Sequence, residues 1–320
     1  GKKYYRKFKD SEQVNIWLNA PVDAIDDSVN TNAARKKTTK AYSASGRSLT
    51  VNSDFVVICA GAIESTGILL RTKKIREKCT NLGLNFTDHI SMKVGVLETN
   101  CPNEIGQLLS PTFENGIMRS PRFEVSKYVQ KRYSIPSSFV HFSYQFPKIS
   151  GFAVIKEILK SFQTNKLDVL IVLNLFRPRI MFELFATFFF RFYHRRLYYP
   201  KGTSFDILID LEQETKSTRF IGLGDLQSDQ TQKLQISWDV SETERSKMWF
   251  VAEEFSKAWR QAGFSKFGQI LLEDNAEVKE RENCFDVYHP TGTIPFGING
   301  DEAVVDENLE LTASRYTFVC

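Results

Sequence analysis

An unbroken apolar run that leads directly into a glycine turn is the feature of this sequence that most restricts its fold. The run is FVVICAG, Phe55–Gly61, and its β-forming residues show no alternation of apolar and polar side chains. Such a run is typical of a strand covered on both faces, as in a parallel sheet. It continues into IESTGILLRTKK, residues 63–74, which ends in the basic residues that favour a helix C-terminus. The order strand, glycine, helix is the local pattern of a dinucleotide-binding α/β domain.

The glycine of this turn allows close contact between the backbone and a ligand. Gly61 has no Cβ atom, so the backbone there can approach a ligand closely. The chain contains no G-x-G-x-x-G sequence, however, and the segment taken alone is a weak nucleotide signal. G-x-S-x-G, Walker A and H-E-x-x-H sequences are also missing, so hydrolase, kinase and zinc-protease functions have no positive support.

The remaining strand signals are antiparallel in character. Residues 12–59 predict a meander that begins with the alternating Val14, Ile16 and Leu18. Residues 204–238 alternate again in three stretches, FDILIDLEQ, RFIGLG and LQISWDV. Between these regions, residues 91–165 contain five prolines and predict loops with short strands, including the alternating aromatic stretch FVHFSYQF at 139–146.

One helix is specified by both of its ends. Ser241 and Glu244 form the S-x-x-E pattern of a capping box, apolar residues then recur at helical spacing, and Gly263 suits the position after the C-terminus. The sequence therefore predicts a helix over residues 241–262.

Composition excludes some partners without naming one. A net charge of +4, from 42 basic and 38 acidic residues, gives no reason to expect nucleic acid. The five cysteines form no C-x-x-C pair, so we expect reduced thiols and no metal site. The 26 phenylalanines suit either a large apolar core or an apolar substrate cavity. The first residue is Gly and the last residues are RYTFVC, from which we expect a portion of a longer protein.

Residues 167–199 allow two interpretations. The segment is strongly apolar and Phe-rich, but charged residues and a proline interrupt it, so a membrane-spanning helix is not expected. We favour a helical hairpin inside a substrate domain. The alternative is contact with a membrane surface, which the mixture of arginine and aromatic residues would suit. The interrupting residues are Asp168, Arg177, Pro178, Arg179 and Glu183.

His289 is the strongest candidate for a catalytic group among the four histidines. It stands in VYHPTGTIPFG, a loop stiffened by proline and punctuated by glycine after a short β-type stretch. His89 follows Asp88, which could fix its orientation. His141 lies in the aromatic strand and suits packing, and His194 suits the surface.

Four segments together resemble the glucose-methanol-choline (GMC) oxidoreductases. FVVICAGAIESTGILL resembles the family's second signature, and NLGLNFTDHIS resembles its LGRNLxDH segment. DLEQETKSTRFIGLG through LQISWDV resembles the strands of the substrate domain. VYHPTGT, followed by AVVDENLEL and YTFV, resembles the C-terminal HPxGTxRMG … VVDxxLRV … LYVVD pattern. The four segments occur in the family's order from about Val14 to Val319.

The resemblance implies an FAD-dependent enzyme with α/β and α+β parts. A partial, Rossmann-like FAD-binding domain would comprise residues 1–90 and 284–320, and residues 91–283 would form an antiparallel-sheet substrate domain flanked by helices. His289 matches the family's active-site histidine. The resemblance assigns cofactor contacts to Val22, Gly61, Ala62, Asp88, His89, Gly292 and Thr293.

The implied reaction oxidises an alcohol to a carbonyl. A base, His289, would take the hydroxyl proton while hydride passes from carbon to flavin N5. The partner would be a small-molecule alcohol, with an electron acceptor that the sequence leaves open. The sequence departs from the family's pattern in lacking the N-terminal glycine fingerprint and the second active-site His or Asn, and in having TIPFG for TxRMG. A non-catalytic remnant and a membrane-surface protein therefore stay open as alternatives.

Overall fold

The computed structural model divides the chain into two compact units. Unit 1 comprises residues 1–87, 214–239 and 290–320, and unit 2 comprises residues 88–213 and 240–289. The residues described are 8–26, 30–31, 34–35, 37–43, 45–164, 173, 175–216, 218–226, 232–273, 284–297 and 302–320.

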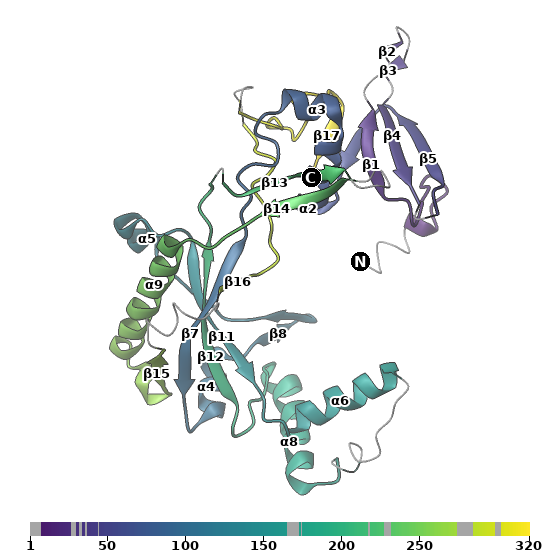
Figure 1. Ribbon diagram of the computed structural model, residues 1–320. Coiled ribbons are helices and arrows are strands. Elements are labelled where there is room, and N and C mark those ends of the chain that lie inside the picture. Colours follow the sequence, from purple (N-terminus) through teal and green to yellow (C-terminus); the bar gives the residue numbers. More distant parts are fainter. Residues whose placement is uncertain are drawn as a thin grey trace. The chain divides into compact units, whose positions relative to one another are not determined.

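Unit 2 is built around a six-stranded antiparallel sheet (Figure 1). Strand β7, His89–Glu98, pairs with β12, Ser204–Glu212, on one side. On its other side β7 pairs with two short strands. Residues Ile90–Met92 of β7 pair with β16, and residues Gly95–Glu98 of β7 pair with β15. The outer strands follow β12 in the order β11, β10. The bounds of the four other strands are β10 Phe123–Glu124, β11 Ser138–Gln145, β15 Gln269–Leu272 and β16 Cys284–Asp286.

Helix α9, Glu242–Gln261, packs on one face of this sheet. Its N-terminus has the predicted capping box, in which the Ser241 hydroxyl accepts from the Glu244 amide and the Glu244 carboxylate accepts from the Ser241 amide. The Trp259 ring packs beside Phe142 of β11, and its indole N–H donates to the Gly268 carbonyl. Gly263 has the left-handed backbone (φ 73°) expected after the helix. The prediction for residues 241–262 is confirmed.

Two further helices of unit 2 form a hairpin at the end of the sheet where β12 begins (Figure 1). They are α6, Gly151–Thr164, and α8, Pro178–Phe189, which continues into a π-helical turn at Phe190–His194. Helix α8 and the π-helical turn lie within residues 167–199, but α6, the helix that pairs with α8, ends before that segment begins, so the hairpin is not the one expected inside it. Asp168 lies outside the described residues. Within the described ranges, no helix combines the length and the apolar character needed to cross a membrane.

Smaller elements complete unit 2. Helix α4 lies between β7 and the β8–β9 hairpin, and α5 precedes β11. Their bounds are α4 Pro102–Leu109, β8 Thr112–Glu114, β9 Ile117–Arg119, α5 Lys127–Tyr133 and the 3-10 turn Phe264–Lys266.

Unit 1 combines a small antiparallel sheet with a parallel strand pair and a helix. The sheet has the order β1-β4-β5, and the parallel pair is β6 with β17. Helix α2 follows β6 directly and buries its C-terminal half in an apolar cluster with Ile58, Ile75 and Val319. The bounds are β1 Val22–Asp26, β2 Asn30–Thr31, β3 Ala34–Arg35, β4 Lys37–Tyr42, β5 Ser48–Ser53, β6 Val56–Ile58, α2 Gly61–Arg71, α3 Lys73–Lys78, β13 Phe220–Leu226, β14 Gln232–Ser237 and β17 Thr317–Val319.

The predicted parallel strand at 55–61 is confirmed, but two expectations about the strands are wrong. Val57 of β6 is exposed, so the described chain covers this strand on one face only. Residues 14–18 form no strand. Their alternation finds no partner strand, and Asn19 (φ 55°) and Pro21 then redirect the backbone.

The expectation of loops with short strands at 91–165 is confirmed only in part: β8 to β10 are short strands and the alternating stretch at 139–146 forms β11, but the helices and the long β7 were not expected. This region supplies most of β7 and the helices α4, α5 and α6. Pro102 starts α4 instead of breaking a helix, because proline is tolerated in the first turn. The coarse fold class is confirmed as a mixed α/β chain with an antiparallel sheet flanked by helices. The compact units differ from the expected blocks 1–90, 91–283 and 284–320 in placing 214–239, with β13 and β14, in unit 1.

A glycine in unit 1 should be irreplaceable. Gly83 has φ 86°, donates its amide to the Thr293 carbonyl and accepts from the Ile221 amide, and a Cβ atom there would lie 2.2 Å from the Ile221 carbonyl oxygen. We expect Gly83→Ala to lower the free energy of unfolding by about 3 kcal/mol or more, because a clash with backbone adds to the left-handed strain.

Gly46→Ala is the matched control for this measurement. Gly46 has φ 78°, yet a Cβ atom there would meet nothing within 4 Å. Its substitution should cost about 1 kcal/mol, from strain alone. Urea unfolding of the two variants compares them, and equal midpoints would contradict the packing role of Gly83.

Candidate active site

Two histidines that are 200 residues apart in the sequence meet at one end of the unit 2 sheet. His89 is the first residue of β7, and His289 lies in the loop after β16. Their ring centroids are 5.5 Å apart and the rings are nearly perpendicular, at 82°. His89 is half-buried, whereas His289 is exposed. The structure thus brings together two of the residues that the sequence singled out.

The Asp88 carboxylate holds the two histidine backbones together. Its Oδ1 atom accepts a hydrogen bond from the amide of His89 (2.6 Å) and another from the amide of His289 (2.9 Å). Asp88 is only 4% exposed, and a buried carboxylate is stable only when hydrogen bonds replace its hydration. From the sequence we expected Asp88 to orient His89. The structure shows that it positions both histidines, through their backbones.

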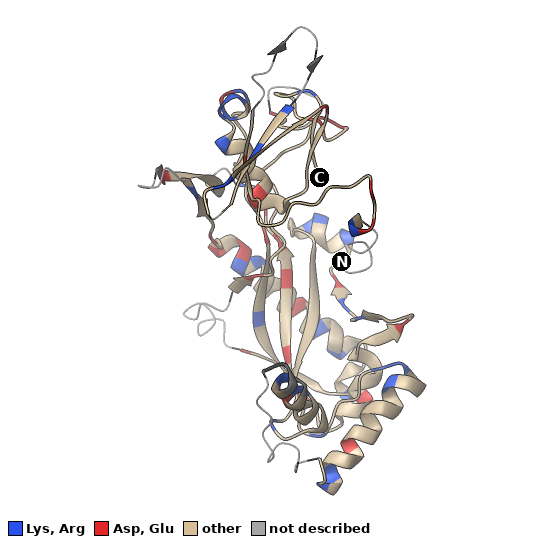
Figure 2. Cartoon of the chain, turned by 90° about the vertical axis from the view of Figure 1, so that its right-hand side faces the viewer, with Lys and Arg blue, Asp and Glu red and all other residues tan. Residues whose placement is uncertain are grey.

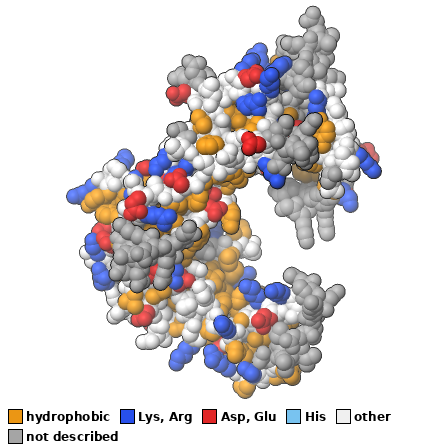
Figure 3. All heavy atoms as spheres, in the orientation of Figure 1, with side chains coloured by type: hydrophobic (Ala, Val, Ile, Leu, Met, Phe, Trp, Pro, Cys, Tyr) orange, Lys and Arg blue, Asp and Glu red, His pale blue; other side chains and the backbone are white. Residues whose placement is uncertain are grey.

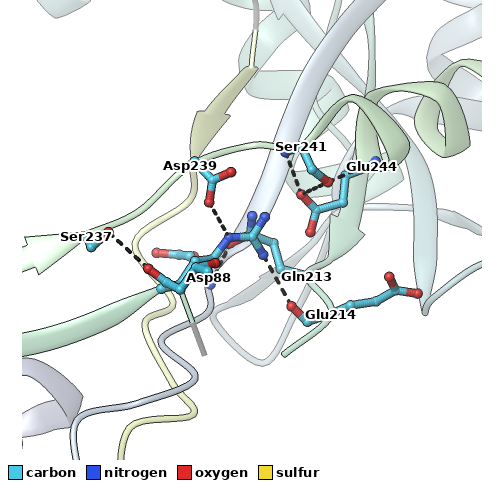
Figure 4. A network of polar contacts seen from close by, with 9 residues as sticks. Asp88, Gln213, Glu214, Ser237, Asp239, Ser241 and Glu244 are labelled. Carbon is cyan, nitrogen blue, oxygen red and sulfur yellow. Dashed lines mark hydrogen bonds and ion pairs between the residues drawn. The ribbon is translucent and has the colours of Figure 1, made fainter. Parts of the chain in front are cut away.

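The backbone around Asp88 is itself fixed by unit 2. Its amide donates to Gln213 Oε1 at 3.1 Å, and its carbonyl accepts from the Gln213 amide (Figure 4). On the opposite side, the Val287 amide donates to the His89 carbonyl at 3.2 Å, and Asp286 of β16 pairs with Ile90. The histidine pair therefore stands on a strand that is hydrogen-bonded along both edges.

Tyr288 is a feature of this site that the sequence analysis missed. Its φ is 60°, a strained value for an aromatic residue, and its side chain is 83% exposed. The turn follows from its neighbours, because the amides of Val287 and His289 are bound to His89 and Asp88. Strain of this kind is common at functional sites. Tyrosine at this position carries no sequence signal for a left-handed backbone.

A second cluster in unit 1 gathers three of the expected cofactor residues. The Thr66 hydroxyl donates to the Ala62 carbonyl (2.7 Å) and lies 2.7 Å from the Thr293 hydroxyl. Thr293 is 1% exposed. Gly292 has φ 92°, and a Cβ atom there would lie 2.0 Å from the carbonyl oxygen of Asn85. Gly292 and Thr293 are therefore packed against their own unit.

Gly61, unlike Val22, differs from these packed residues. Gly61 is exposed at the N-terminus of α2, has φ 76° and has open space where a Cβ atom would be. Its helix has no side-chain cap at Ala60. Val22 opens β1 and packs against the apolar cluster of unit 1.

Unit 1 also contains a buried cation that sequence reasoning did not identify. Arg219 is fully buried, its Nε donates to Asp239 Oδ1 at 2.8 Å, and its Nη1 donates to the Glu214 carbonyl; Figure 4 labels the two acceptor residues. Its carbonyl accepts from the Phe86 amide. This arginine ties the segment before β13 to the segment after β14.

The other two histidines lie away from the pair. His141 of β11 has its Nε2 atom 3.1 Å from Asp210 Oδ1. Burial would raise the pKa of Asp210, but the hydrogen bond with His141 and the charges of His141 and Arg122 outweigh it and hold that pKa below its ordinary value. His194 ends the π-helical turn and is exposed, as expected.

Removing the Asp88 carboxylate should release the histidine pair. We expect Asp88→Ala to speed amide hydrogen exchange at His289 and to lower the free energy of unfolding by about 2 to 3 kcal/mol, because the His89 and His289 amides lose a charged acceptor. Hydrogen exchange resolved by NMR measures the local effect.

Asp88→Asn is the control, since it keeps an acceptor oxygen but not the charge. It should retain slower exchange at His289 than Asp88→Ala does. Unchanged exchange in Asp88→Ala would contradict the proposed role.

Comparison with known proteins finds a family match in the C-terminal third of the chain. Residues 217–320, which include the His289 loop, match the family model described as GMC oxidoreductase. A comparison with curated protein sequences gave no match.

Solved structures share the fold at low identity. An FAD-dependent oxidoreductase from Chaetomium thermophilum has a TM-score of 0.52 at 10% identity, covering 99% of this chain and 58% of that one. A formate oxidase variant from Aspergillus oryzae RIB40 has a TM-score of 0.51 at 16% identity, covering 97% and 56%. A fungal aryl-alcohol oxidase has a TM-score of 0.50 at 10% identity, covering 99% and 58%. The chain spans a little over half of each of these proteins. The C-terminal third of the chain, residues 217–320, therefore belongs to the GMC oxidoreductase family by sequence, and nearly the whole chain shares the fold of these solved structures.

Proposed function

We propose that this chain carries the catalytic histidine of an FAD-dependent oxidoreductase acting on the CH–OH group of a small-molecule alcohol. The observation that carries the proposal is the His89–His289 pair, held by the buried Asp88 carboxylate. Unit 2 carries the histidine pair that would meet the substrate, and residues of unit 1 would contribute to FAD binding. GMC family members bind FAD.

His289 is the group best suited to move a proton. Its side chain is exposed while its backbone amide is fixed at 2.9 Å from Asp88 Oδ1. A base must be both accessible to the substrate and held at a defined position. In this proposal an imidazole nitrogen of His289 takes the proton from the substrate hydroxyl oxygen. The half-buried His89 lies edge-to-face against it and limits the positions that its ring can take.

Part of unit 1 fits a bound cofactor. The exposed N-terminus of α2, with open space above Gly61 and no side-chain cap, leaves backbone amides available to a polar ligand group. Gly61 and Ala62 would line this position, and Val22 would contribute backbone from β1. Gly292 and Thr293 would act by supporting the Ala62–Thr66 turn, and cofactor contacts by Asp88 and His89 stay a prediction. When bound, the flavin would supply the acceptor for hydride from the alcohol carbon.

Replacing His289 should slow the chemical step. In the FAD-loaded protein, we expect His289→Ala to lower the rate of flavin reduction by an alcohol substrate about 10²-fold or more, because a positioned acid–base group is lost. Stopped-flow absorbance of the flavin measures the rate. His194→Ala, which changes an exposed histidine of the same unit, should leave the rate unchanged. An unaltered rate in His289→Ala would remove His289 from the reaction, and flavin that no alcohol reduces would favour a non-catalytic remnant.

A side chain on Gly61 should weaken FAD binding. Asparagine tolerates the left-handed backbone, so Gly61→Asn mainly fills the space above the turn. We expect at least a tenfold loss of affinity in a flavin fluorescence titration, about 1.4 kcal/mol. Gly46→Asn makes the same change at an open left-handed glycine in another loop and should bind FAD normally. Equal affinities for the two variants would place the cofactor elsewhere.

A further inference from the structure

We propose that helix α8 and its π-helical turn bind an anionic membrane surface. Seven large apolar side chains on this segment are exposed, with exposed fractions between 42% and 74%. They recur at the spacing of one helical face. The set is Met181, Phe182, Phe185, Phe188, Phe189, Phe192 and Tyr193. We call these seven residues the aromatic face.

The aromatic face reverses the usual polarity of a surface helix. The side of α8 that packs inward carries Ile180, Glu183 and Ala186, whereas the solvent side carries phenylalanine. Together, the seven side chains of the aromatic face expose roughly 700 Å² of apolar surface, taking about 150–250 Å² for each complete aromatic side chain. Monomeric proteins rarely expose patches larger than about 300–600 Å² unless something binds there.

Contacts on the inward side fix the rotation of α8. The Glu183 carboxylate is buried, accepts from the Gly151 amide at 2.8 Å and pairs with Arg179 at 2.9 Å. Leu184 lies against Gly151, where a Cβ atom would come within 3.1 Å of it. Turning the helix to bury its phenylalanines would break both contacts and leave the Glu183 carboxylate without its hydrogen-bond partners. The outward position of the aromatic face is therefore specified by the fold.

The aromatic face is also ordered within itself. The rings of Phe189 and Tyr193 stack at 5.1 Å and 12°, and those of Phe188 and Phe192 lie 4.4 Å apart. These rings pack along the helix and are presented together on its outer side. A continuous row of exposed rings needs no matching groove, which suits the interface of a bilayer.

Charge selects the partner. Residues 177–196 contain five arginines and one glutamate, and that glutamate is the buried Glu183. The surplus of four positive charges equals the net charge of the whole chain, +4. Basic and hydrophobic side chains lie side by side over the hairpin at the lower right of Figure 3, and Figure 2 shows basic residues at its helix ends. A second copy of the chain would bring like charges together, whereas anionic headgroups would neutralise them.

The aromatic face lies away from the histidine pair within unit 2. The chain leaves α8 and enters β12 at Ser204, whereas His89 pairs with Glu212 at the other end of β12. Nine residues of strand separate the two ends, about 30 Å. Lipid binding therefore does not depend on the proposed chemistry and can be measured without flavin.

Vesicle flotation of the full 320-residue chain tests the proposal. The chain should float with phosphatidylcholine vesicles that contain 30% phosphatidylserine, and at least tenfold less with phosphatidylcholine alone. Phe185→Gln with Phe188→Gln should lower binding at least 30-fold. Arg177→Gln with Arg195→Gln should lower it about 25-fold, at about fivefold for each basic residue. High salt should also lower vesicle binding, because it screens the attraction between the arginines and the anionic headgroups.

A matched pair controls for the loss of exposed apolar side chains. Ile117 and Met118 of β9 are adjacent and more than half exposed in the same unit, so Ile117→Gln with Met118→Gln should float like the unaltered chain. Absence of binding by the unaltered chain would overturn the proposal, as would an equal loss in the control. Lipid-free dimerisation that the Phe185/Phe188 variant abolishes would assign the face to a second copy and would also overturn it.

Discussion

One buried carboxylate organises the part of this molecule to which we assign chemistry. The segments that contain His89 and His289 are far apart in the sequence, and strand pairing alone leaves the amides of both histidines to be satisfied at the end of β7. Asp88 satisfies them by accepting both histidine amides on one oxygen. Because the carboxylate is buried, leaving it unpaired would be costly, so the two backbones and the charge stabilise one another.

The same two segments also organise unit 1, and glycine makes this possible. Thr87 and Thr291 exchange backbone hydrogen bonds, and Gly292 lies against Asn85 too closely for any other residue. Each segment then passes into unit 2, between Thr87 and Asp88 and between His289 and Pro290. Within unit 1 the Thr87–Thr291 backbone contact holds the two segments together, and within unit 2 the Asp88 carboxylate does so.

Local signals were sufficient where a residue acts on its own neighbours. The capping box at Ser241, the glycine after α9 and the apolar run before Gly61 each specify an element within a few residues, and the structure confirms all three. Sequence signals failed where contacts with residues far away in the sequence determine the local structure. The alternation at 14–18 finds no strand to pair with. The coupling of Asp88 to His289 and the strain at Tyr288 arise only once 200 residues of intervening chain have folded, and the buried Arg219 depends on Glu214 and Asp239, which flank the β13–β14 pair.

Helix α8 shows the same limit for surfaces. Its sequence is apolar enough for a core helix, and hydropathy alone cannot say which side faces outward. The structure decides this through Glu183, because a carboxylate inside the hairpin needs the Gly151 amide and Arg179. Satisfying that one charge leaves the phenylalanines on the outside. A helix that turns its acid inward and its aromatic rings outward pairs only Arg179 with that acid and leaves the other four arginines of residues 177–196 without an acidic partner from the same segment, which is the charge distribution that an anionic surface attracts.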